Sequence, residues 1–94
     1  GGEAGKADPA SRSGRDSIGR FCEKEEGLLS EVARSIAETG RVLPKDLAPV
    51  EYLRLSLPGA HPERALNPSD LSRIAAQARV LSRCLRRTRE ALGF

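Results

Sequence analysis

Apolar residues recur with helical spacing over residues 68–92. At 100° per residue they fall within about 80° of one another, and they are Leu71, Ile74, Ala78, Leu81, Leu85 and Leu92. The opposite side gathers four arginines, which are Arg79, Arg83, Arg86 and Arg87. Asn67 is a favourable N-cap, Pro68 suits the first helical position, and the Asp70 carboxylate complements the positive end of the helix dipole. The pattern predicts a basic amphipathic helix over 68–92.

A second apolar stripe lies within residues 17–39, between a capping Asp16 or Ser17 and a helix-terminating Gly40. Its members are Ile18, Phe21, Cys22, Leu28, Leu29, Val32, Ala33 and Ile36. The stripe is about 140° wide, which is broader than a two-stranded coiled-coil seam and predicts a helix that touches two neighbours. Glu25 falls inside the stripe, where it either reaches out at the edge or serves as the buried partner of an arginine.

The segments outside these two helices are shorter or carry no apolar pattern. Residues 1–16 contain four glycines and no aliphatic or aromatic side chain larger than alanine, which predicts a disordered tail. Residues 49–57 fit either a strand or a helix. We favour a two-turn helix that begins at Pro49, because a strand here has only Val42 and Leu43 to pair with. Tyr52 and Leu55 then point away from its core face.

These elements predict an all-α fold, as a helical hairpin or three-helix bundle. Two long amphipathic helices (17–39 and 68–92) flank a short middle helix (49–57) in a single small domain over 17–94, preceded by the tail over 1–16. A coiled coil with another chain explains the pattern of 71–92 as well, although it spans only three heptads. A chain of 94 residues buries a modest core, so we expect marginal stability or stability gained from a partner.

Charge is distributed unevenly although the net charge is only +3. The predicted helix 17–39 has five glutamates against three basic residues, a net charge of −2. Residues 68–92 have six arginines against two acidic residues, a net charge of +4. The two helices can therefore complement each other, or the basic helix can bind an acidic partner. Cys22 and Cys84 lie on different helices, which predicts reduced thiols and an intracellular protein, cytoplasmic or nuclear. No run of residues is apolar enough to predict a transmembrane segment.

Candidate chemistry is sparse. The single histidine, His61, lies in a predicted surface loop, and no cysteine or serine has a nucleophile motif. No glycine-rich phosphate loop and no set of three convergent metal ligands can be assembled. We therefore predict a protein that is not an enzyme, with no catalytic residue, no metal site and no cofactor.

The remaining prediction is a helical protein–protein interaction module, a subunit or docking domain of a larger complex that forms hetero- or homo-oligomers. Its predicted partner-binding residues are Leu71, Ile74, Leu81 and Leu85 with Arg79, Arg83, Arg86 and Arg87. The apolar stripes of 71–92 and 18–36 would form a shared core that a partner helix completes, and the arginines would select an acidic neighbour. The alternative is a nucleic-acid-binding domain whose arginines contact phosphates. Against that alternative, residues 68–92 contain no aromatic residue for base stacking, and the arginine face has no Asn or Gln to contact base edges.

Overall fold

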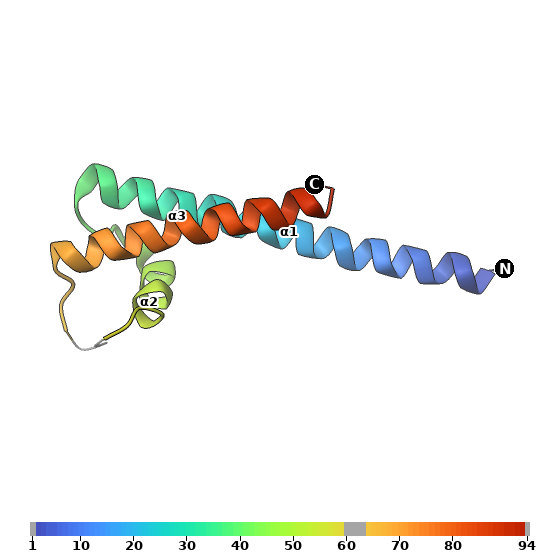
Figure 1. Cartoon of the computed structure of the whole chain (residues 1–94), viewed down its shortest axis with the longest axis horizontal. Coiled ribbons are helices and arrows are strands. Elements are labelled where there is room, and N and C mark those ends of the chain that lie inside the picture. The colour runs from blue at the N-terminus through green and yellow to red at the C-terminus, as the bar shows by residue number, and fades with distance from the viewer. Residues whose placement is uncertain (1, 60–63, 94) are drawn as a thin grey trace.

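Two long helices run antiparallel and a short third helix packs across them (Figure 1). The computed structural model describes residues 2–59 and 64–93, with side chains from residue 14 onward. Its elements are α1 (Gly2–Thr39), a 3-10 turn η1 (Pro44–Asp46), α2 (Leu47–Leu55) and α3 (Pro68–Ala91). No strand occurs in these two ranges. The predicted all-α fold with two long helices and a short middle one is thus confirmed.

Helix α1 runs from Gly2 to Thr39 and so includes all of the predicted helix 17–39, with a further helical stretch before it. Its N-terminal part projects past the end of α3 (Figure 1), and the side chains of residues 14–18 are exposed. The helix ends as predicted at Gly40, which has φ +67° and donates its N–H to the Ile36 carbonyl over 2.8 Å.

The middle element is a helix, as predicted, but it begins at Leu47 rather than at Pro49. Pro44 opens the 3-10 turn that precedes it. Pro49 is tolerated because it lies in the first turn, where its missing N–H would have no partner within the helix. Val50 and Leu53 are fully buried, whereas Tyr52 and Leu55 are exposed as the periodicity predicted.

Helix α3 starts where the sequence placed it. Asn67 is extended, its side-chain oxygen accepts the N–H of Asp70 over 2.8 Å, and the Asp70 carboxylate accepts the N–H of Asn67 over 3.0 Å. This reciprocal capping box satisfies two backbone donors at once. The predicted and observed ends, residues 92 and 91, agree within the ordinary fraying of helix termini.

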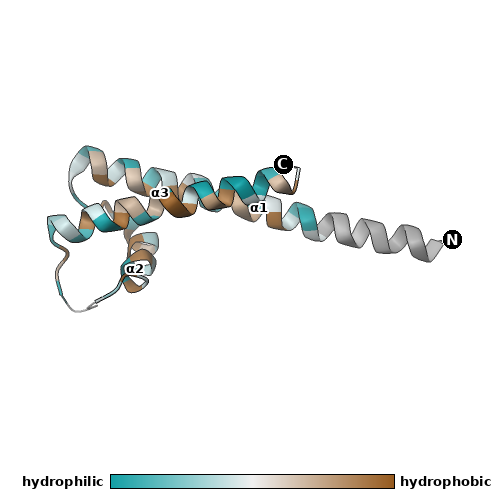
Figure 2. Cartoon of the chain, in the orientation of Figure 1, coloured by the Kyte–Doolittle hydropathy of each residue, from teal (hydrophilic) through white to brown (hydrophobic). Residues whose placement is uncertain are grey.

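The two apolar stripes meet in one core, visible as brown positions along the facing sides of α1 and α3 (Figure 2). Its buried members are Leu29, Val32, Ala33, Ile36, Val50, Leu53, Leu71, Ile74, Ala75 and Ala78. Every helix contributes, and α2 does so through Val50 and Leu53 alone. The shared core that the sequence predicted between the two long helices is therefore formed within a single chain.

A candidate docking groove and a separate arginine stripe

A groove opens where the three helices come together. It has a volume of about 570 Å³. Helix α1 supplies Phe21, Glu25, Leu28 and Leu29, α2 supplies Ala48, Pro49 and Tyr52, and α3 supplies Leu81, Cys84, Leu85 and Thr88. Only Glu25 carries a charge, so the lining is mostly apolar.

The groove is open because α2 is short. The apolar stripe of α1 is broad enough for two neighbours, and α3 covers one side of it. Helix α2 has only nine residues and joins the core through Val50 and Leu53. The stripe therefore remains uncovered at Phe21, which is 59% exposed, and at Leu28, which is 37% exposed. Tyr52 lies on the α2 wall and is 71% exposed.

Glu25 lies among the apolar residues of this groove. Its side chain is partly buried, and it has no ion pair or hydrogen bond with the part of the chain that the structure describes. The arginine partner that the sequence considered for Glu25 belongs instead to its neighbour. The Glu26 carboxylate lies 3.2 Å from Nε of Arg86 and accepts a hydrogen bond of 2.9 Å from Nε of Arg89.

These contacts join the acidic helix to the basic one. The hydrogen bond from Arg89 to Glu26 raises the pKa of the arginine above its ordinary value. Beside it, Ser82 Oγ donates to the carbonyl of Glu26 over 3.1 Å and lies 2.7 Å from Ser30 Oγ. The complementarity between the two helices that the charge distribution allowed is thus present. Arg89 was not among the predicted site residues, although it lies three residues after Arg86 on the same helix face.

The predicted partner-binding residues of α3 separate into groups. Leu71 and Ile74 are buried in the core, whereas Leu81 and Leu85 are half-buried and line the groove. Arg86 is paired with Glu26. The other three arginines are exposed and have no acidic partner among the residues whose side chains are described; we name Arg79, Arg83 and Arg87 the arginine stripe.

The arginine stripe does not face the groove. Each of its members lies two positions from Leu81 or Leu85 in the sequence, which places it about 160° away around the helix axis. None of the three lines the groove. Leu81 and Leu85 therefore lie on a different side of α3 from the arginine stripe, as the helical periodicity predicted.

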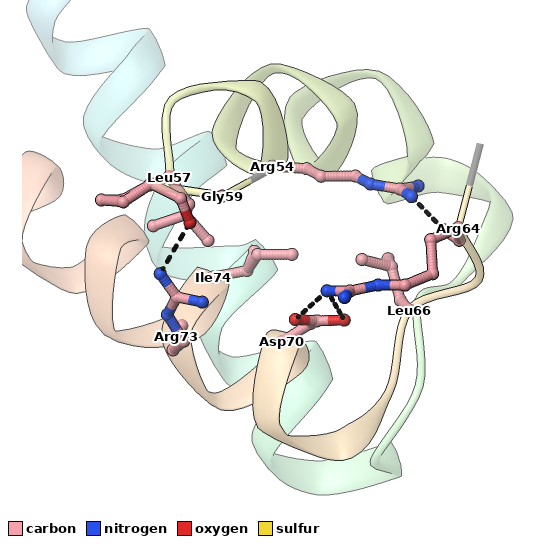
Figure 3. A pocket seen from close by; sticks show the side chains of 9 residues that line it. Arg54, Leu57, Gly59, Arg64, Leu66, Asp70, Arg73 and Ile74 are labelled. Carbon is pink, nitrogen blue, oxygen red and sulfur yellow. Dashed lines mark hydrogen bonds and ion pairs between the residues drawn. The ribbon is translucent and has the colours of Figure 1, made fainter. Parts of the chain in front are cut away.

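Three other arginines surround a small cavity where the 57–66 connection meets α3 (Figure 3). Arg54 donates to the carbonyl of Arg64, Arg73 donates to the carbonyl of Pro58 over 3.3 Å, and the Arg64 guanidinium lies 3.3 Å from the Asp70 carboxylate. The cavity measures about 20 Å³, which is room for one water. We interpret this cluster as a tether for the connection.

The Asp70 carboxylate has a lowered pKa. The main cause is the backbone N–H of Asn67, whose hydrogen bond favours the ionised form. Desolvation opposes this effect, and the nearby charges of Arg64, Arg73 and Arg54 add to it. The ionised side chain thus stabilises both the start of α3 and the tether.

Few other described residues are candidates for metal binding or reactive chemistry. The described side chains contain no group of three or more His, Cys, Asp or Glu residues that could hold a metal ion. His61 lies outside the described residues. Cys22 is buried and Cys84 is exposed in the groove, and both are free thiols. Within the described ranges, no helix is long and apolar enough to cross a membrane.

Comparison of the chain with protein-family models, with curated proteins and with solved structures finds no match. Function is therefore inferred from the geometry of the groove and of the arginine stripe.

Proposed function

We propose that this chain is a non-enzymatic helical protein–protein interaction module that binds an amphipathic helix of a partner protein in its groove. The observation that carries the proposal is the convergence of Phe21, Leu28 and Tyr52, exposed apolar side chains from two helices, on one groove floored by Leu81 and Leu85. A groove of this kind is the usual receptor for the apolar face of a helix. Contiguous exposed apolar surface typically marks an interaction site.

The expected energetics point to Phe21 and Tyr52 as the main contributors. Burying one large apolar side chain that was exposed is worth about 1.5–3 kcal/mol. Aromatic residues at the centre of an interface commonly dominate the binding free energy. A bound helix would also shield the half-buried Leu81 and Leu85 from water. Removing one aromatic anchor should therefore weaken binding by at least about tenfold.

The arginine stripe supports a second contact in the same assembly. Its three guanidinium groups lie at four-residue intervals along the exposed side of α3, where a helix seated in the groove does not reach. Exposed charges of this kind raise the association rate and select partners more than they add affinity. We propose that the stripe meets an acidic surface of the same complex. The free thiols of Cys22 and Cys84 fit a reducing, intracellular compartment.

The test is affinity purification with mass spectrometry, comparing the native chain with two leucine-to-aspartate variants. Leu28→Asp places a charge in the groove, and Leu47→Asp places the same charge at an exposed leucine outside it. We expect partners that the native chain and Leu47→Asp retain and that Leu28→Asp loses. Circular dichroism must show equal helix content for all three chains. Identical sets of proteins captured by both variants would contradict the proposal.

Nucleic-acid binding is the second candidate, and the unpaired state of the arginine stripe within the described structure is the observation that favours it. Phosphate contacts would give an affinity that falls steeply as salt rises. The double variant Arg83→Glu with Arg87→Glu should then abolish a mobility shift that the native chain produces. If the native chain shifts neither duplex DNA nor RNA at low salt, this candidate is removed.

A further inference from the structure

Glu25 is the only charged side chain that lines the groove. It follows Phe21 by four residues and precedes Leu28 by three, so it lies midway along the α1 wall. The nearest cation in the sequence, Lys24, is displaced by about 100° around the helix axis and does not line the groove. Glu25 thus faces the groove as a partly buried carboxylate with no ion pair in the described structure.

A helix that fills the groove removes water from this carboxylate. Burial of an unpaired charge is costly, whereas a cation that pairs with it compensates much of the lost hydration. We propose, building on the docking function above, that the bound helix carries a Lys or Arg that pairs with Glu25. Glu25 is then the residue that determines which helices the groove accepts.

The dimensions of the groove define the partner further. The α1 wall runs from Phe21 to Leu29 and the α3 wall from Leu81 to Thr88, separations of eight and seven positions. Seven helical residues span about 10 Å, or two turns. The partner helix therefore presents apolar residues about seven positions apart, and its basic residue lies between them, three or four positions from each.

A second copy of this chain is the competing occupant, because α1 itself carries Lys24 between Phe21 and Leu28. In an antiparallel pair of α1 helices, however, the two-fold axis carries each flank of one helix onto the same flank of the other. Glu25 would then lie on the same side as Glu25 of the second copy, away from both lysines. Charge therefore favours a different protein as the occupant.

The experiment is a displayed library of amphipathic helices with variable apolar positions and one central position that encodes Lys, Arg, Gln, Leu or Glu. Selection is run on the native chain, on Glu25→Lys and on the control Glu38→Lys, which reverses an exposed charge of α1 outside the groove. We expect the native chain and Glu38→Lys to enrich Lys or Arg over Glu at least about tenfold, and Glu25→Lys to enrich Glu. A central preference that Glu25→Lys leaves unchanged would overturn the inference.

Two further readouts separate this inference from the docking function itself. If selected helices bind only when Leu28 is intact but show no basic preference, the groove function stands and the role of Glu25 is refuted. If no helix binds in a manner that Leu28→Asp abolishes, the groove function fails and the inference fails with it. Sedimentation velocity of the native chain should show a monomer at all concentrations. A dimer that Leu28→Asp dissociates would place a second copy in the groove and also overturn the inference.

Discussion

Truncation of Leu53 to alanine shortens a fully buried side chain, one of the two residues through which α2 joins the core. A Leu→Ala substitution at a buried site loses the transfer free energy of the deleted carbons and leaves a cavity behind. The resulting loss of folding free energy is usually about 2–5 kcal/mol. Helix α2 has nine residues between two connections, so it can shift toward the cavity and refill part of it. We therefore expect a loss of about 3 kcal/mol, near the lower middle of that range.

Leu55→Ala is the matched control, since it is the same substitution two residues along the same helix at a side chain that is 59% exposed. It leaves no cavity, and the higher helix propensity of alanine offsets part of the lost contact. Its cost should stay below about 1 kcal/mol. For a domain of this size, 1 kcal/mol corresponds to about 4–8 °C in Tm. The buried truncation should thus lower Tm by roughly 12–24 °C and the exposed one by a few degrees.

Thermal melts and urea titrations followed by circular dichroism measure both variants against the native chain. The substitution at Leu53 must be the more damaging in both measurements. Equal losses for the two leucines, or a loss at Leu53 below about 1 kcal/mol, would refute the reasoning, since surface sites typically give such small effects. In that case α2 would not be held to the hairpin through Leu53.

Three other predictions concern the polar contacts. Asn67→Ala removes the N-cap of α3 and should cost about 1 kcal/mol, seen as a fall in Tm that the exposed neighbour Ser69→Ala does not produce. Because the folded-state pKa of Asp70 is lowered, its stabilising contribution is complete above the ordinary value of 3.8 and is lost as pH falls below 3.8 through the folded-state pKa. The Tm difference between the native chain and Asp70→Asn should therefore shrink on acidification. Glu26→Gln should lower Tm, and by less at high salt, because Glu26 has two arginine partners. Glu25 has no such partner, so Glu25→Gln should leave Tm unchanged or raise it. Equal effects of the two substitutions on Tm would contradict the pairing of Glu26 with the arginines.

The sequence predicted well those parts of the fold that depend on local residue patterns. Asn67, Pro68 and Asp70 mark the start of α3 within four residues, and Gly40 marks the end of α1 by the positive φ it adopts. The start of α1 is different, because the residues before Ile18 have no apolar periodicity and give no pattern from which a helix start could be predicted. The 3-10 turn that moves the start of α2 to Leu47 likewise leaves no apolar periodicity to detect.

The groove was predictable in part. The periodicity of 49–57 placed Tyr52 off the core, and the width of the α1 stripe indicated a second neighbour. Which residues that neighbour leaves uncovered depends on the length of α2 and on where it crosses the hairpin, and no single helix encodes this. The same limit explains why Glu26 rather than Glu25 pairs with the arginines: the choice follows from how α1 is rotated against α3, which only the assembled core determines.

The separation of leucines from arginines on α3 also changes how partner choice must work. A helix advances 100° per residue, so residues two apart point about 160° away from each other. A partner seated against Leu81 and Leu85 next meets Cys84 and Thr88, and it lies on the far side of α3 from Arg83. In the proposed complex, the arginine stripe would therefore contact a second, acidic surface rather than the helix that enters the groove. In the proposed complex, Glu25 is the one charge within the groove that a bound helix must satisfy, so Glu25 on the α1 wall, rather than the four arginines of α3, would discriminate among helices.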